Sequence, residues 1–99
     1  MGSDLDFEGL QRDADHHRLN FLRHEIEMAN TFCDVAETEL RIGDRENAAR
    51  SIADATKGYE TANRFLTDPK HGGRVPENER RKMAQDLARL RERIDGFKI

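Results

Sequence analysis

The chain has 99 residues, which fits one domain, and it is polar: charged residues make up 37% and hydrophobic residues 35%. Its formal net charge of −3 speaks against a nucleic-acid binder. The sequence has no apolar run near the ~18 residues of a membrane span and no signal peptide, so we expect a cytoplasmic protein that does not associate with membranes. Its single cysteine, Cys33, excludes an intrachain disulfide.

The first 15 residues predict a partly ordered leader, ahead of a bundle over 16–99. Ser3 and Asp6 have the spacing of a capping box, so a short helix over about 4–11 is compatible with the pattern, although Gly9 weakens it.

Three helices are expected after the leader, over about 16–42, 45–66 and 76–95. In each, apolar residues recur at steps of three and four, which is the period of one helix face. Gly43-Asp44 supplies a helix end followed by an N-cap, and the short break predicts an antiparallel hairpin. The Asp-Pro and Gly-Gly pairs of 67–75 predict a flexible connector. The apolar faces are Leu19, Leu22, Ile26, Ala29, Cys33, Ala36 and Leu40; Ala48, Ile52, Ala55, Tyr59, Ala62 and Leu66; and Met83, Leu87, Leu90, Ile94 and Phe97.

These elements predict an all-α fold, a three-helix up-down-up bundle built on a long antiparallel helical hairpin. Cys33 falls on the apolar face of the first helix, so we interpret it as a core residue rather than a nucleophile.

A cluster of histidines is the first candidate for chemistry. His17 and His24 are seven residues apart, hence on one helix face, and Asp13 lies one turn before His17. His16 is adjacent. These residues form the basis of one alternative, a small enzyme or a ligand- or metal-binding protein with a site near His17 and His24. The pattern lacks a zinc-protease helix, because Met28 stands where the second histidine would be. No catalytic residue, cofactor, metal or small-molecule ligand is therefore predicted.

Basic residues of the third predicted helix form the second alternative, a nucleic-acid-associated regulator. Arg80, Arg81 and Lys82 spread over about 200° of the helix at 100° per residue, so they do not form one cationic face. Aromatic residues that would stack on bases are missing from this helix. The structural interpretation is an exposed helix whose basic residues face the acidic first helix. Residues 1–47 hold 12 acids and 5 bases, and residues 48–99 hold 8 acids and 12 bases, so the two halves have charges of opposite sign.

Residues 32–55 resemble a single tetratricopeptide-like helical hairpin. Phe32, Val35 and Ala36 have the spacing of that motif's Trp, Leu and Gly, and Gly43-Asp44 forms its turn. Glu39 and Glu60 depart from the motif, which has tyrosine and proline there. The second helix matches through Ala48, Ile52 and Ala55. A microtubule-interacting-and-trafficking-like three-helix domain has the same style of hairpin. The resemblance implies a module that binds peptides or helices in a groove.

The preferred interpretation is a small non-enzymatic helical protein-interaction or structural module that binds another protein or itself. Phe7, Leu10, Phe21 and Met28 lie off or at the edge of the first apolar face and are expected to form an exposed apolar patch. Cover by the N-terminal leader is the alternative for the same four residues.

Overall fold

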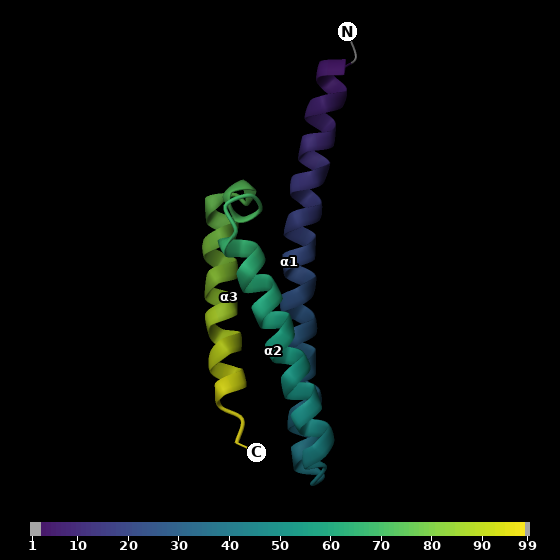
Figure 1. Cartoon of the computed structure of the whole chain (residues 1–99), viewed down its shortest axis with the longest axis vertical. Coiled ribbons are helices and arrows are strands. Elements are labelled where there is room, and N and C mark those ends of the chain that lie inside the picture. Colours follow the sequence, from purple (N-terminus) through teal and green to yellow (C-terminus); the bar gives the residue numbers. More distant parts are fainter. Residues whose placement is uncertain (1–2, 99) are drawn as a thin grey trace.

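The computed structural model describes the backbone of residues 3–98 and the side chains of residues 14–98. Three long helices run up, down and up, as expected: α1 (Ser3–Arg41), α2 (Arg45–Thr67) and α3 (Glu77–Asp95), with a short 3-10 helix, η1 (Gly72–Arg74), before α3. The helices lie side by side in a bundle that extends over 64 × 20 × 16 Å (Figure 1). The all-α three-helix bundle predicted from the sequence is confirmed.

Helix α1 begins at Ser3, not near residue 16 as predicted. Between Ser3 and Arg41, Gly9 is the only glycine and there is no proline. One glycine inside a helix costs only about 1 kcal/mol relative to alanine, which does not end the helix. Residues 3–15 of the leader are thus the first part of α1, which projects past the ends of α2 and α3 (Figure 1). A continuous helix carries these residues away from the bundle, so they do not fold back over Phe21 or Met28.

The turn between α1 and α2 has the predicted chemistry. Gly43 adopts a φ of 81°, the left-handed region that glycine tolerates best. Asp44 caps α2, because its carboxylate accepts a hydrogen bond from the backbone N–H of Asn47 at 3.2 Å. The two helices therefore reverse direction within a few residues and pack along their length.

The core is built from the three predicted apolar faces. Alanines fill most of the seam between α1 and α2, and longer side chains close the side next to α3. Within residues 14–98, none of the helices is both long enough and apolar enough to cross a membrane. The buried hydrophobic residues are Leu22, Ile26, Ala29, Cys33, Ala36, Ala48, Ala55, Ala62, Leu66, Val75, Met83, Leu87, Leu90 and Ile94.

The connector between α2 and α3 is packed against α2 at Gly72, which is buried. A Cβ on Gly72 would lie 1.7 Å from the backbone oxygen of Leu66, so only glycine fits there. Asp68 organises the turn: its backbone oxygen accepts from the N–H of Gly72 at 2.7 Å, and its carboxylate accepts from the N–H of Lys70 at 2.9 Å. The expectation of a flexible connector misses this packing requirement.

Candidate functional site

An apolar stripe along the outside of α1 is the main candidate surface. Among residues 14–98, four large hydrophobic side chains are exposed: Phe21 (39%), Met28 (40%), Val35 (42%) and Ile42 (73%). They are seven residues apart, and Phe7 and Ala14 extend the same spacing toward the N-terminus. A helix turns by about 20° less than two full turns in seven residues, so the stripe runs almost parallel to the axis. We call Phe21, Met28 and Val35 of α1, together with Ile42 directly after its last residue, the α1 stripe.

The α1 stripe does not lie on the side of α1 that holds α3. Met28 and Asn30 are two positions apart, so at 100° per residue they are about 200° apart around the helix, or about 160° by the shorter way. Asn30 accepts hydrogen bonds from Arg93 of α3. The stripe therefore occupies the border of α1 that is left free after α2 and α3 have packed.

A hollow beside the stripe is produced by two small residues. Gly58 of α2 faces Ala29 of α1 so closely that a Cβ on Gly58 would be 3.2 Å from the Cβ of Ala29. Met28 and Phe32 line one side of the hollow, whose volume is about 350 Å³. On the α2 side it is lined by Asp54, Lys57, Gly58 and Thr61. A large side chain from another helix has room there.

Phe21, at the upper end of the stripe, is half-covered by aromatic neighbours. Its ring centroid is 5.0 Å from that of Phe65 on α2, and Phe65 in turn stacks on His71 at 4.4 Å. The Nδ1 atom of His71 is buried and has no hydrogen-bond partner among the described residues. This cluster fixes the end of the stripe to the connector.

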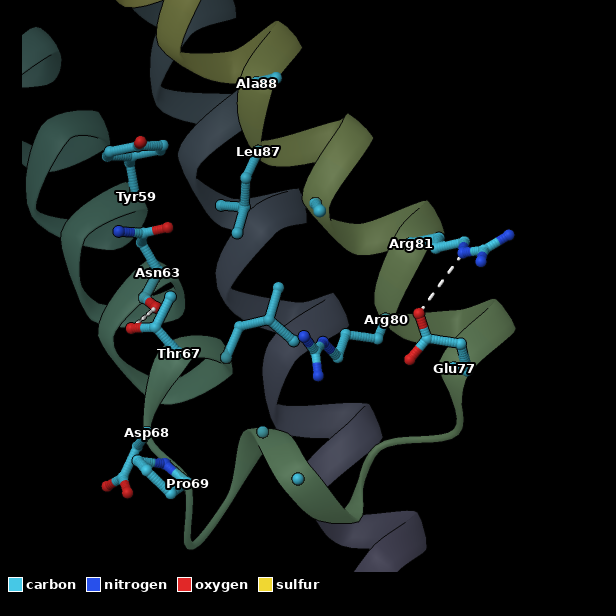
Figure 2. A pocket seen from close by; sticks show the side chains of 14 residues that line it. Tyr59, Asn63, Thr67, Asp68, Pro69, Glu77, Arg80, Arg81, Leu87 and Ala88 are labelled. Atoms are coloured by element: carbon cyan, nitrogen blue, oxygen red, sulfur yellow. Dashed lines mark hydrogen bonds and ion pairs between the residues drawn. The ribbon is translucent and has the colours of Figure 1, made fainter.

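A second hollow lies between α2 and α3, and its volume is about 580 Å³. Figure 2 shows Arg80 reaching from α3 across this groove toward α2, whereas Arg81 turns to Glu77. Tyr59 and Asn63 of α2 stand at its other side. No feature of the sequence pointed to this groove, because it exists only when α3 is placed against α2.

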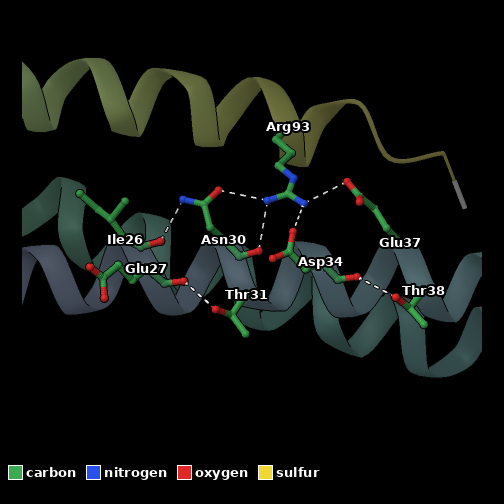
Figure 3. Close-up of polar contacts among 8 residues, drawn as sticks. All are labelled: Ile26, Glu27, Asn30, Thr31, Asp34, Glu37, Thr38 and Arg93. Carbon is green, nitrogen blue, oxygen red and sulfur yellow. Dashed lines mark hydrogen bonds and ion pairs between the residues drawn. The ribbon is translucent and has the colours of Figure 1, made fainter.

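A polar cluster joins α3 to α1 next to the core (Figure 3). The guanidinium of Arg93 donates hydrogen bonds to the backbone and side-chain oxygens of Asn30 at 3.1 and 3.2 Å, to Glu37 at 3.0 Å, and to Asp34. The hydrogen bond to Asp34 is the main cause that raises the pKa of Arg93 above its ordinary value. Because all its partners are within α1, the cluster acts as a structural clamp.

The histidines are not brought together into a site. His16, His17 and His24 are exposed on α1, and the described residues contain no group of three His, Cys, Asp or Glu side chains that could hold a metal ion. Asp13 lies outside the described side chains. His17 lines a shallow hollow with Phe21, Phe65 and His71, so two imidazoles and two phenyl rings meet there.

Cys33 is fully buried, as predicted for a core residue. Burial raises the pKa of the Cys33 thiol, and the nearby Arg93 lowers it in part. A buried protonated thiol is a poor nucleophile, since the thiolate is the reactive form.

Of the four residues expected to form an exposed patch, Phe21 and Met28 are exposed on one face of α1. The side chains of Phe7 and Leu10 lie outside the described residues. Sequence reasoning missed Val35 and Ile42, although their spacing of seven from Met28 was the signal that would have found them.

Searches against protein-family models, curated proteins and solved structures gave no significant match. The tetratricopeptide-like resemblance of residues 32–55 thus stays a prediction.

Proposed function

We propose that this protein is a small non-enzymatic interaction module that binds a helix of another protein, or of a second copy of itself, along the α1 stripe. The observation that carries the proposal is the seven-residue spacing of its exposed large hydrophobic side chains. Exposed apolar patches on a small domain mark interaction sites, and a spacing of seven is the repeat by which helices pack in left-handed supercoils.

The hollow beside Met28 supports the same function. When two helices pack, the side chains of one helix insert between the side chains of the other. The receiving surface therefore needs gaps beside its exposed side chains. The close approach of Gly58 to Ala29 leaves such a gap at the middle of the stripe. A partner helix would thereby pack against α1 and α2 together and complete a four-helix arrangement.

The test replaces the stripe without disturbing the core. In the double variant Met28→Gln and Val35→Gln, two exposed side chains lose most of their apolar character. The matched control, Thr31→Gln and Thr38→Gln, changes two exposed α1 residues that lie three positions after Met28 and Val35, respectively. Sedimentation equilibrium over a wide concentration range is expected to show association for the wild type and the control and only monomer for the stripe variant.

A monomeric wild type calls for a second measurement. Photo-crosslinking in the native host, with a photoreactive residue at position 28 or 35, is expected to give a defined product. Position 89, on the exposed side of α3, serves as the control. A monomer that also gives the same products from positions 28 and 89 contradicts the proposal.

A further inference from the structure

We propose that the groove between α2 and α3 binds a small organic anion with an apolar body, held through the guanidinium of Arg80. No lining residue of this groove belongs to the α1 stripe, so the inference is independent of the proposed function. Its volume of about 580 Å³ is within the range of ligand pockets, which is roughly 300–1,000 Å³.

The groove exists because α3 presents small side chains to α2 at its outer edge. Ala84 and Ala88 are one turn apart, and neither fills the space in front of Asn63 and Tyr59. Below them, the buried side chains of Leu66 and Leu87 contribute apolar floor. An elongated apolar body can therefore lie along the seam.

The connector closes one end of the groove, where Asp68, Pro69, Gly72 and Gly73 contribute to its lining. The fit of Gly72 against the backbone oxygen of Leu66 holds this wall in place. The wall makes the groove a blind-ended site, which suits a small molecule better than a peptide that runs through.

The lining contains two carboxylates, Asp68 and Glu77, and two guanidiniums, Arg80 and Arg81, but neither carboxylate is paired with Arg80. Glu77 is paired with Arg81 at 3.4 Å, and the carboxylate of Asp68 accepts the N–H of Lys70 within its own turn. Among residues 14–98, no carboxylate lies within ion-pair distance of Arg80, whose side chain points across the groove (Figure 2). A guanidinium offers five donors and no acceptor.

Neutral polar groups complete the rim. The side-chain amide of Asn63 and the hydroxyl of Tyr59 form no hydrogen bond with the described part of the chain, so both are available to a ligand. With Arg80 they present more donors than acceptors. A carboxylate attached to an aliphatic or aromatic body is the ligand chemistry that this combination recognises.

The experiment titrates the ¹⁵N-labelled full-length protein with octanoate and, separately, with octanol. Saturable shifts of the backbone amides around Asn63, Thr67, Ala84 and Ala88 are expected with octanoate. Octanol is expected to bind at least about tenfold more weakly, because its neutral hydroxyl accepts a weaker hydrogen bond from a guanidinium than a carboxylate does. Equal affinity for the two, or shifts confined to the α1 stripe, would overturn the proposal, as would the absence of saturable shifts at millimolar octanoate.

Two variants locate the site. Arg80→Gln is expected to weaken octanoate binding by about tenfold or more, whereas Arg89→Gln, the same change at an exposed position of α3 outside the groove, leaves it unaltered. Ala88→Leu is expected to fill the groove and abolish binding, and leucine is a good helix former, so the fold is retained. Arg80→Gln with wild-type affinity disproves the assignment.

A leucine tripeptide with an acetylated N-terminus and a free C-terminus separates two sources of the same carboxylate. Tighter binding than that of octanoate assigns the groove to a peptide C-terminus, and weaker binding assigns it to a free organic acid. Both results sustain the proposal that the groove takes an apolar carboxylate.

Discussion

At the scale of single residues, Arg93 joins α3 to α1 through several charge-assisted hydrogen bonds. Its guanidinium is hydrogen-bonded to Asn30, Asp34 and Glu37, and its side chain is only partly exposed. We expect Arg93→Met to lower the free energy of unfolding by about 1–2 kcal/mol, because charge-assisted hydrogen bonds outweigh exposed ion pairs. Urea unfolding measures this. The control, Arg81→Met, loses one exposed ion pair and should change stability by less than about 0.5 kcal/mol.

The thiol of Cys33 provides a second residue-scale prediction. Its pKa is raised in the folded state by burial, so the folded protein holds the proton where the unfolded chain would release it. The contribution to stability is complete below the ordinary thiol value and is lost as the pH rises above 9.0. We expect unfolding free energy to fall in this range by up to about 1.4 kcal/mol per pH unit more steeply than in Cys33→Ala. If the unfolding free energy falls with pH equally steeply in the wild type and in Cys33→Ala, the Cys33 thiol does not cause the loss of stability at alkaline pH.

At the scale of elements, the connector and α2 depend on one glycine. We expect Gly72→Ala to destabilise the protein by about 2 kcal/mol or more, because the added Cβ collides with the backbone oxygen of Leu66 and must displace η1. Gly73→Ala is the matched control: its Cβ meets no atom within 4 Å. Thermal unfolding of the two variants provides the comparison. Equal melting temperatures would mean that η1 can shift at no cost.

The positions of the helices could be predicted from sequence because they depend on local patterns. Gly43 and Asp44 mark the hairpin, Gly96 follows the last residue of α3, and the period of three and four marks each core face. The predicted start of α1, near residue 16, was wrong. Gly9 lowers the helix propensity of the first residues, but no proline or second glycine follows it before Gly43 to end the helix. The Arg93 cluster and the α2–α3 groove depend on helices separated by many residues, and no spacing within one helix encodes either of them.

At the scale of the whole molecule, charged residues far apart in the sequence form ion pairs between the elements of the fold. Arg93 binds carboxylates of α1, Arg74 lies 3.7 Å from Asp15, and Arg23 lies 3.2 Å from Glu79. The first and last of these contacts join α3 to α1, and the second joins the connector to α1. Arg74 and Arg93 of the C-terminal half thus hold the acidic first helix, whereas the contact of Arg23 with Glu79 pairs charges in the opposite sense. In the basic run, Arg81 is paired with Glu77 of α3 itself, not with a carboxylate of α1.

The α1 stripe is not needed to build the hydrophobic core, because the core residues of the three helices pack against one another without it. We expect the double variant Met28→Gln and Val35→Gln to change the unfolding free energy by less than about 1 kcal/mol, since exposed substitutions are typically within 0.5 kcal/mol each. Leu22→Gln, one position from Phe21 but fully buried, should cost several kcal/mol because it places an amide in the core. Urea unfolding at low protein concentration isolates these intrinsic effects from association. A loss in the double variant as large as that of Leu22→Gln would make the stripe part of the fold and remove the reason for expecting a partner there.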